Sequence, residues 1–559
     1  MLRRNDGLRA NVPLLFGLLA TAALGCSSSG TDINAGHPIG ITAGSGGSAG
    51  GMSAGGAGGG LHAGGAAGAH DAGGGGVAGA GRPGVGGAGA AGAAPGGTGG
   101  SAAGKGGNGR GGAGKSGSGS SAGGNGTGGA GGGGTPPPGT DDLIVAPDGV
   151  DDAPGTLDAP TTLASALTRI TAGHIIFARD GRYEFAQQLT IARGNSGSAG
   201  NPKQLAPYAS EHPVLDFSSE PYGTGSNPRG LQIDGSYWRV RGLEVLGAAD
   251  NGIYVSGNGN VIEACVTHGN RDTGLQLGRA SSSDADMASW PSNNLILDCE
   301  SYDNYDAPPG SGENADGFAA KLTVGSGNVF RGCVSHNNID DGWDLYTKND
   351  TGPIGPVTID QCISYANGTL TDGTSNANGD RNGFKLGGDD IAVAHVVTRS
   401  VAFDNGKNGF TWNSNPGAIR LSNNLAFDNV EGNFKFGDNS TATSAVFTNN
   451  VSFWTVTAGS QGDKVIGTDT PGTNAWWDDS KNTSTVAGTS IAVTAADFAS
   501  SLAAAKVARN ADMSLNFAPF ALAPASDLVN AGVVPPGTLP FDATSYYVDA
   551  PDLGAVEAH

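Results

Sequence analysis

The chain has 559 residues, and its 51 acidic residues outnumber its 30 lysines and arginines, which gives a formal net charge of −21. This charge argues against a nucleic-acid partner, because phosphate backbones are bound by basic surfaces. The 100 glycines are spread unevenly, so composition divides the chain into parts that can bury a core and parts that cannot.

Residues 1–26 resemble a bacterial secretory signal of the lipoprotein type. Three arginines precede an apolar stretch from Val12 to Leu24, and Cys26 follows directly after Gly25. We expect a secreted or cell-envelope protein, of the outer-membrane lipoprotein type, whose only membrane contact is a lipid on Cys26. Ordinary signal cleavage remains open, because Ala23 stands where such signals usually carry leucine. The apolar stretch is shorter than the roughly 18 to 20 residues of a membrane-spanning helix.

Residues 27–139 are mostly Gly, Ala and Ser, with almost no large apolar side chain. We expect this linker to be disordered, since it cannot bury a core. The folded domain is expected over residues 140–559, a length that is ordinary for a solenoid. It begins with a predicted capping helix over residues 160–170, with Leu163 and Leu167 on one face.

From about residue 261 to residue 455 the sequence repeats with a fixed phase. The equivalent positions lie 24 to 38 residues apart and are occupied by Cys265, Cys299, Cys333, Cys362, Ser400, Asn424 and Asn450. A fixed phase with variable length indicates a coil that tolerates insertions. An asparagine recurs five positions later, which predicts a ladder of amides stacked about 4.8 Å apart, formed by Asn270, Asn304, Asn338, Asn367, Asn405 and Asn429.

Each repeat also carries a large apolar residue, usually followed by a second one two positions later. This period of two is the mark of a strand with one buried face. The first of these residues are expected to stack inside the solenoid: Leu275, Phe318, Trp343, Phe384, Phe410 and Phe434. The pattern predicts an all-β fold, a single-stranded parallel β-helix. Residues 455–559, where the repeat fades, are expected to form irregular last coils and a C-terminal cap.

The residues between the buried positions must point outward on every coil. In order along the coils, this outer row reads Gln276, Ala319, Asp344, Lys385, Thr411 and Lys435. Asp344 and Lys385 therefore fall on adjacent coils, and Asp316 aligns with Asp341 in the same way. Together with Asp340, these aspartates are predicted to form one cluster.

Carboxylates so close to one another repel and normally hold a cation. A set of oxygen ligands without His or Cys favours Ca²⁺ over zinc or copper, so Asp316, Asp340, Asp341 and Asp344 are the predicted calcium ligands. The alternative is an exposed acidic turn. The register that these aspartates share with Lys385 favours the metal.

A lysine beside an aspartate is most often a surface ion pair of little energetic consequence. Bound Ca²⁺ would change this for Lys385, because a nearby cation lowers the lysine pKa and leaves a neutral amine able to act as a base. Such a base suits abstraction of the C5 proton of a uronic acid. Ca²⁺ on the adjacent carboxylate would stabilise the developing charge, and loss of the C4 oxygen would complete a β-elimination.

Three further basic residues are candidates for gripping uronate carboxylates: Lys321 and Lys435 on the outer row or beside it, and Arg381 in a flanking insertion. Each could equally be a solubilising surface group. The polar insertions at residues 306–315 and 368–381 leave their coils at one phase, so we expect them to wall a cleft beside the aspartates.

Five cysteines leave one that cannot pair within the chain, and Cys26 accounts for it. The other four share an inward phase on successive coils, where parallel side chains suit a disulfide poorly. We expect buried free thiols, with disulfides left open as the alternative because secretion would allow them.

Three stretches closely resemble the polysaccharide lyase family 9 pectate lyases: Glu-Asn-Ala-Asp-Gly-Phe-Ala (313–319), Asp-Asp-Gly-Trp-Asp-Leu-Tyr (340–346) and Asn-Gly-Phe-Lys-Leu-Gly-Gly (382–388). The resemblance implies a right-handed parallel β-helix. It also implies a calcium site at Asp316, Asp340, Asp341 and Asp344, and a base at Lys385. It extends more weakly from about residue 142 to residue 557.

The leading hypothesis is a calcium-dependent, monomeric lyase that cleaves polygalacturonate, the pectin backbone. A lyase of another uronan, such as alginate, is the nearest alternative, because the chemistry would be the same. A hydrolase would need paired acid and base carboxylates and no lysine. A β-helical adhesin or sugar-binding module, with calcium as a structural ion, is the alternative outside enzymes.

Overall fold

The structure is a computed structural model that describes residues 138–223, 227–438, 443–470 and 472–558. The predicted signal over residues 1–26, and all but the last two residues of the predicted linker, lie outside the described residues. Within the described ranges, no helix is both long and apolar enough to cross a membrane.

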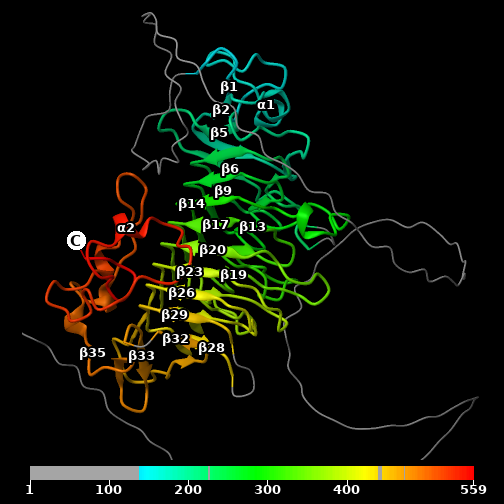
Figure 1. Ribbon diagram of the computed structural model, residues 1–559. Coiled ribbons are helices and arrows are strands. Elements are labelled where there is room, and N and C mark those ends of the chain that lie inside the picture. The colour runs from blue at the N-terminus through cyan, green and yellow to red at the C-terminus, as the bar shows by residue number, and fades with distance from the viewer. Residues whose placement is uncertain (1–137, 224–226, 439–442, 471, 559) are drawn as a thin grey trace, which may run out of the picture. The chain divides into compact units, whose positions relative to one another are not determined.

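Each repeat contains three short runs of alternating or β-branched residues, and each run forms a strand in one of three sheets (Figure 1). Neighbouring strands within a sheet come from successive coils and pair in parallel, as in a β-helix. The exceptions are the antiparallel pairs β33–β34 and β34–β35 at the end of sheet B. The predicted all-β parallel solenoid is therefore confirmed.

Sheet A contains twelve strands. In chain order they are β1 (Leu143–Val145), β2 (Ile175–Ala178), β5 (Lys203–Pro207), β8 (Trp238–Arg241), β11 (Val261–Glu263), β14 (Leu295–Leu297), β17 (Asn328–Arg331), β20 (Val357–Asp360), β23 (Val396–Thr398), β26 (Arg420–Ser422), β29 (Val446–Thr448) and β32 (Thr468–Asp469).

Sheet B contains thirteen strands. They are β3 (Gly181–Glu184), β6 (Pro213–Asp216), β9 (Glu244–Leu246), β12 (Val266–His268), β15 (Glu300–Tyr302), β18 (Val334–His336), β21 (Ile363–Tyr365), β24 (Val401–Phe403), β27 (Leu425–Phe427), β30 (Val451–Phe453), β33 (Ala475–Asp478), β34 (Thr483–Val486) and β35 (Ala492–Val493).

Sheet C contains ten strands and carries the outer row predicted from the sequence. They are β4 (Leu189–Ile191), β7 (Leu231–Ile233), β10 (Ile253–Val255), β13 (Leu275–Leu277), β16 (Phe318–Ala320), β19 (Trp343–Asp344), β22 (Phe384–Lys385), β25 (Asn408–Thr411), β28 (Gly432–Phe436) and β31 (Lys464–Val465).

The predicted asparagine ladder connects the coils inside the solenoid. Asn270 donates from Nδ2 to Oδ1 of Asn304 at 2.9 Å, and Asn304 donates to Asn338 in the same way at 2.7 Å. The ladder continues through Asn367, Asn405 and Asn429. All six side chains are buried, so each amide satisfies its neighbour where water cannot.

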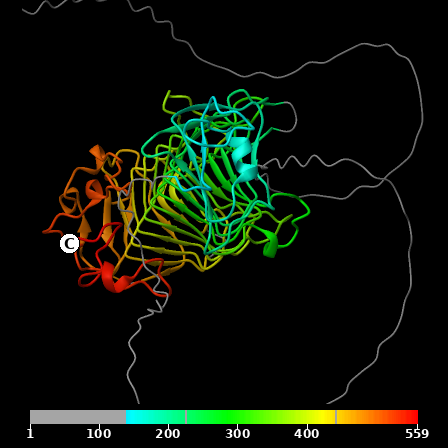
Figure 2. The ribbon, with the colours of Figure 1, turned by 90° about the horizontal axis from the view of Figure 1, so that it is seen from above.

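The helix α1 (Leu163–Arg169) lies at the N-terminal end of the described coils, as Figure 2 shows from above. It is shorter than the predicted range 160–170, because Thr162 is its N-cap and accepts a hydrogen bond from the Ser165 backbone nitrogen at 3.1 Å. Leu163 and Leu167 are buried in the same hydrophobic core as the first strands. The expected capping helix is thus present.

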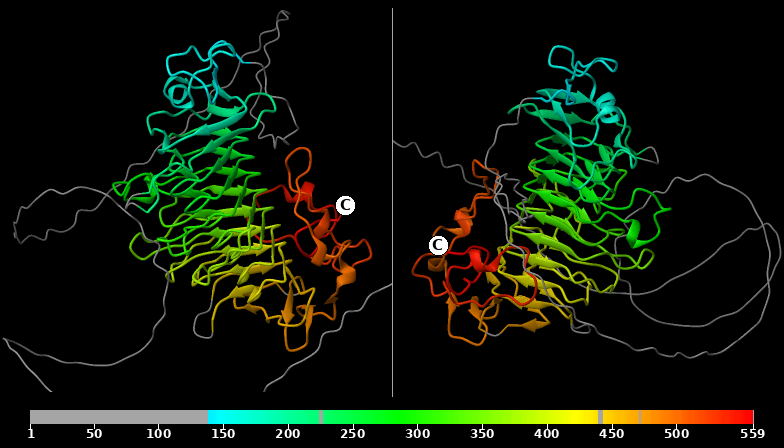
Figure 3. Two further views of the ribbon diagram at one scale, coloured as in Figure 1. Left: turned by 180° about the vertical axis from the view of Figure 1, so that it is seen from behind. Right: turned by 45° about the horizontal axis from the view of Figure 1, so that its top comes forward.

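The repeat continues through β31, β32 and β33, and the chain then leaves the coils. We call residues 495–558 the C-terminal segment; it contains the short helix α2 (Ala543–Tyr546). Figure 3 shows it, in orange and red, beside the coils rather than at their end. Arg509 of this segment donates to the Cys299 carbonyl at 2.9 Å, and Arg331 on β17 donates to the Pro540 carbonyl at 2.7 Å.

The cysteines of the repeat are free and buried, which confirms the predicted thiols: Cys265, Cys299, Cys333 and Cys362. Their Sγ atoms lie near backbone carbonyls of their own and neighbouring coils, as at Cys333, whose Sγ is 3.4 Å from the Ile296 oxygen. They act as small core residues.

Candidate active site

The strand register of sheet C brings the predicted site residues together. Phe318, Trp343 and Phe384 stack inside the solenoid with ring centroids 4.8 Å apart from coil to coil. The alternating direction of strand side chains then places Asp344 and Lys385 outward and opposite one another, on the paired strands β19 and β22. The whole predicted outer row, from Gln276 to Lys435, has the expected register.

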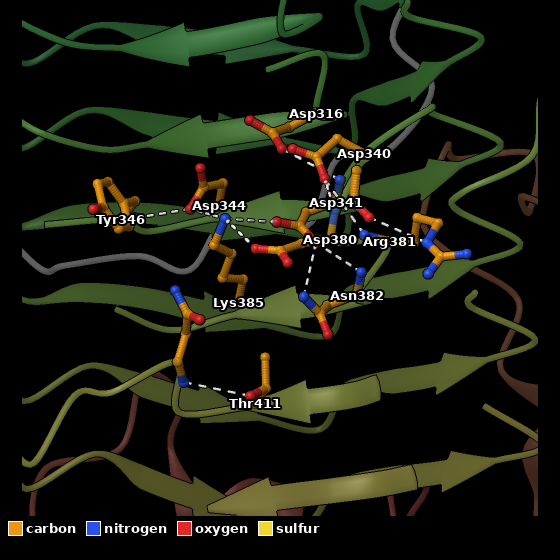
Figure 4. A network of polar contacts seen from close by, with 12 residues as sticks. Asp316, Asp340, Asp341, Asp344, Tyr346, Asp380, Arg381, Asn382, Lys385 and Thr411 are labelled. Carbon is orange, nitrogen blue, oxygen red and sulfur yellow. Dashed lines mark hydrogen bonds and ion pairs between the residues drawn. The ribbon is translucent and has the colours of Figure 1, made fainter. Parts of the chain in front are cut away.

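Three of the four predicted carboxylates converge (Figure 4). Asp316, Asp341 and Asp344 each offer one oxygen within 4.8 Å of the others, and all three side chains are buried. Asp340 lies beside them but outside this group of three. Its Oδ1 accepts hydrogen bonds from the backbone nitrogens of Asp380 and Arg381, so this carboxylate holds the end of an insertion.

Glycines directly after the aspartates allow the coils to approach one another. A Cβ on Gly342 would lie 2.0 Å from Ser364 Oγ, and one on Gly317 would lie 2.0 Å from Ser335 Oγ. The carboxylate of Asp341, directly before Gly342, is oriented by Asn382. The backbone nitrogen of Asn382 donates to Asp341 Oδ1 at 2.7 Å, and its Nδ2 donates to the same oxygen at 3.0 Å. The glycines thus permit close packing of the coils, and Asn382 orients the acid.

Burial shapes the electrostatics of the cluster. It raises the pKa of Asp316 and that of Asp341 to about 7 against the opposing effect of nearby lysines, with neighbouring carboxylates adding to the rise. Burial and the charge of Asp341 also raise the pKa of Asp340 well above its usual range. Carboxyl groups that ionise so reluctantly are stabilised by a bound cation.

Lys385 lies at the edge of the cluster, with a side chain that is 10% exposed. Its Nζ is 3.2 Å from Asp341 Oδ2, 3.9 Å from Asp344 Oδ1 and 3.0 Å from Asp380 Oδ2. Burial lowers the pKa of Lys385, but these carboxylates outweigh burial and raise the pKa well above its ordinary value. In this arrangement the lysine is an ammonium ion.

The three predicted substrate contacts lie in different surroundings. Lys321 is buried, with Nζ 2.7 Å from Asp316 Oδ2 and 3.2 Å from Asp344 Oδ2, so it belongs to the cluster. Arg381 is partly exposed and donates from Nε to the Gly379 carbonyl at 3.1 Å. Lys435 is exposed, and its Nζ lies 4.0 Å from Glu431. Contact of any of the three with substrate stays a prediction.

Sequence reasoning missed Asp380 and Lys407. Asp380 binds Lys385 through Oδ2 and Lys407 through Oδ1, at 3.0 Å and 2.9 Å. Burial raises the pKa of Asp380, but the two lysines outweigh it and hold the pKa below its usual range. Asp380 lies at the end of a polar insertion, which has no repeat register by which the residue could be aligned. The available signal was the closeness of Asp380 to Lys385 in the sequence.

The two insertions contact each other beside the site. Nδ2 of Asn376 and Nδ2 of Asn378 donate to the Ser311 carbonyl at 2.9 Å and 3.0 Å, joining the insertion at 368–381 to the one at 306–315. They leave their coils next to the aspartates, as predicted. The cleft that they were expected to wall beside the aspartates stays a prediction.

The donor atoms of the cluster fit a calcium ion. They are carboxylate oxygens, the ligands that Ca²⁺ prefers. Asp341 Oδ2 is buried and makes no hydrogen bond; Lys385 Nζ lies 3.2 Å away without hydrogen-bond geometry. A buried oxygen that lacks a hydrogen bond and lies beside two other carboxylates is a ligand atom that a cation can bind.

Comparison with known proteins agrees with this geometry. A family model described as the Pel9A-like, right-handed β-helix region matches residues 143–450. Pectate lyase L of Paenibacillus polymyxa (strain SC2) is 51% identical over 392 residues, covering 70% of this chain and 83% of that protein.

Solved structures extend the comparison. The crystal structure of pectate lyase Pel9A matches with a TM-score of 0.60 and 31% identity, over 75% of this chain and 96% of the other. A rhamnogalacturonan lyase matches with a TM-score of 0.55 and 25% identity, over 67% of this chain and 95% of the other. The solenoid is thus right-handed, and the chain is a polysaccharide lyase that belongs to the family 9 pectate lyases.

Proposed function

We propose that the protein cleaves polygalacturonate by β-elimination in a calcium-dependent reaction. Lys385 is the general base, and Asp316, Asp340, Asp341 and Asp344 bind the Ca²⁺. The observation that carries the proposal is the convergence of three buried carboxylates, two of which, Asp341 and Asp344, lie within 3.9 Å of the ammonium group of Lys385. The names of the related lyases support pectate as the substrate class.

The residues of this chain divide the work of the reaction. The neutral amine of Lys385 takes the proton from C5, the electron pair left behind forms the C4–C5 double bond, and the bond from C4 to the glycosidic oxygen breaks. That oxygen takes a proton from solvent. Bound Ca²⁺ would supply positive charge beside the uronate carboxylate and disfavour the ammonium form of Lys385.

The carboxylates around Lys385 explain why the base would need the metal. Asp341, Asp344 and Asp380 keep the lysine protonated, and an ammonium ion cannot accept a proton. Neutralising Asp341 and Asp344 by a cation would remove much of that stabilisation. Asp341 and Asp344 would thus keep Lys385 protonated without metal. They would also bind the ion that allows its neutral amine to form.

The decisive experiment follows absorbance of unsaturated uronate when the protein is mixed with polygalacturonate, first with calcium and then with chelator. Lys385→Met should lower kcat by about a hundredfold or more while still binding calcium. Lys203→Met is the matched control, because Lys203 is also a buried lysine but lies on β5 of sheet A. Lys385→Met with normal kcat would exclude the proposed base.

The choice of substrate is tested in the same assay. The likeness to a rhamnogalacturonan lyase makes rhamnogalacturonan the second substrate to try, and alginate the third. A signal only on one of these would keep the chemistry and replace polygalacturonate. The expected envelope location and the lipid on Cys26 stay predictions.

A further inference from the structure

We propose that Lys321 is a built-in competitor of the calcium ion. Its ammonium group neutralises the metal-binding carboxylates while the ion is absent and has to yield when the ion binds. The inference rests on the proposed calcium site at the aspartate cluster. It assigns to Lys321 a role in metal affinity in place of contact with substrate.

The contacts of Lys321 are with members of the group that would hold the ion. Its Nζ lies 2.7 Å from Asp316 Oδ2 and 3.2 Å from Asp344 Oδ2, and the side chains of all three residues are at most 5% exposed. The ammonium and a metal ion would therefore share Asp316 and Asp344, two of the four proposed calcium ligands. Both positive charges cannot keep these contacts at full strength.

The backbone that follows Lys321 is held in place. The Leu322 nitrogen donates to the Tyr346 carbonyl at 2.8 Å, and the Thr323 nitrogen donates to the Lys321 carbonyl at 2.8 Å. The base of the side chain is thus anchored to the next coil. Its ammonium can withdraw from an arriving ion only by changing rotamer.

Lys385 differs from Lys321 in this respect. Its ammonium also contacts Asp380, which is not among the proposed calcium ligands and is partly exposed. Lys385 can therefore keep one partner after the ion binds. Among the described carboxylates, the ion pairs of Lys321 are with Asp316 and Asp344, which makes it the direct competitor.

A lysine in this place lets the domain fold before it meets the metal. Three carboxylates buried side by side without any counter-charge would strongly destabilise the folded state. The two ammonium groups offset that repulsion. The consequence is weaker metal binding, because a unit charge a few ångströms away opposes the arriving dication.

The test is a calorimetric titration of calcium into the metal-free full chain, its Lys321→Met variant and its Lys203→Met variant. Lys321→Met keeps the length of the side chain and removes the charge, so calcium should bind about tenfold or more tightly. Lys203→Met changes the net charge equally at a lysine whose ammonium donates to Asn195. This control should bind calcium as the wild type does.

Thermal unfolding supplies the second measurement. In chelator, Lys321→Met should unfold at a lower temperature than the wild type, and saturating calcium should restore its stability. A variant that unfolds in chelator and folds with calcium therefore supports the competitor. A variant that stays unfolded with calcium would overturn it, because the ion would then not replace the ammonium.

The outcomes separate this inference from the proposed function. Calcium binding by the wild type with equal or weaker binding by Lys321→Met would overturn the competitor and leave the calcium site standing. Binding by the variant alone would support the competitor. Absence of binding in both would overturn the competitor and the proposed calcium site together.

Discussion

At the scale of single residues, the ring of Tyr346 packs directly against a glycine of the next coil, Gly388. A Cβ on Gly388 would lie 2.2 Å from two carbons of that ring. The Tyr346 hydroxyl donates to Asp389 Oδ1 at 2.6 Å, and the ring lies 5.6 Å from Lys385 Nζ. The ring therefore forms a fixed neighbour of the proposed base.

Gly388→Ala should displace this ring. The added methyl overpacks the contact, so the free energy of unfolding should fall by about 1 to 3 kcal/mol, and kcat should fall with it. Denaturant unfolding and the absorbance assay measure the two effects. Gly200→Ala is the control, because nothing lies within 4 Å of a Cβ at Gly200. Equal behaviour of the two variants would show that the ring moves aside freely.

The residues of the site differ in how far the sequence could predict them. Asp344 and Lys385 were predictable, because the period of two and the repeat phase together determine their register. Asp340 was expected among the converging carboxylates; its Oδ1 binds the backbone of the insertion, and its role as a calcium ligand stays a prediction. For Asp380 the repeat gave no register, because the path of a long insertion depends on contacts that no repeat encodes, and closeness in sequence to Lys385 was the available signal.

At the scale of strands and coils, the ladders show what a repeat predicts well. Asn270 and its equivalents follow each cysteine phase by five positions, and they stack as expected. A second ladder precedes the phase by five positions and begins with Asn260, Asn294 and Asn328. The same spacing on the other side of the cysteines would have revealed it, so this ladder could have been predicted from the sequence.

His395 occupies the position of an asparagine in this second ladder. The Val357 nitrogen donates to His395 Nδ1 at 3.1 Å, as the Asn260 nitrogen donates to Asn294 Oδ1. Nδ1 must therefore be unprotonated. Nε2 is buried without a hydrogen-bond partner, and burial lowers the pKa of His395 to about 3.

His395→Asn should reduce the loss of stability in acid. Because the unfolded histidine has a pKa of about 6.5, the unfolded chain gains a proton below that pH and the folded chain does not. Wild-type stability should therefore fall by about 1.4 kcal/mol per pH unit between about pH 6.5 and pH 3 from this residue alone. Asparagine can accept the same hydrogen bond without titrating.

Urea unfolding of both proteins at pH 7 and pH 5 checks this prediction. The aspartates contribute equally to both proteins, so the difference between the two pH dependences isolates His395. It should amount to about 2 kcal/mol in favour of the variant at pH 5. Parallel pH dependences would show that the folded protein accommodates the imidazolium.

At the scale of the whole molecule, the C-terminal segment was the part least accessible to sequence reasoning. Its residues lack the repeat, because they bind the outside of the coils and do not form coils. Phe520 packs against Phe403 and Phe427 of sheet B, from coils about a hundred residues earlier in the chain. Such contacts depend on the shape of the packed surfaces and not on the spacing of residues in the sequence, so no repeat period predicts them.

Arg399 joins the C-terminal segment to sheet A. Its guanidinium hydrogen-bonds the buried carboxylate of Asp360 through Nε and Nη2, at 2.9 Å and 2.8 Å to Oδ1. The same group lies 3.7 Å from the centre of the Phe541 ring and 4.5 Å from that of Tyr546. One buried cation thus satisfies an acid on the coils and two aromatic rings of the segment.

Arg399→Met should loosen the segment more than the coils. Asp360 would lose one of its two arginine partners, and the rings would lose their cation, so we expect the free energy of unfolding to fall by about 3 kcal/mol. Limited proteolysis with mass analysis of the fragments should show the first cuts within residues 495–558. Lys481→Met, at an exposed ion pair, is the control and should be cleaved at the same sites as the wild type. First cuts among the coils would mean that Arg399 stabilises sheet A and that the segment is held by its other contacts.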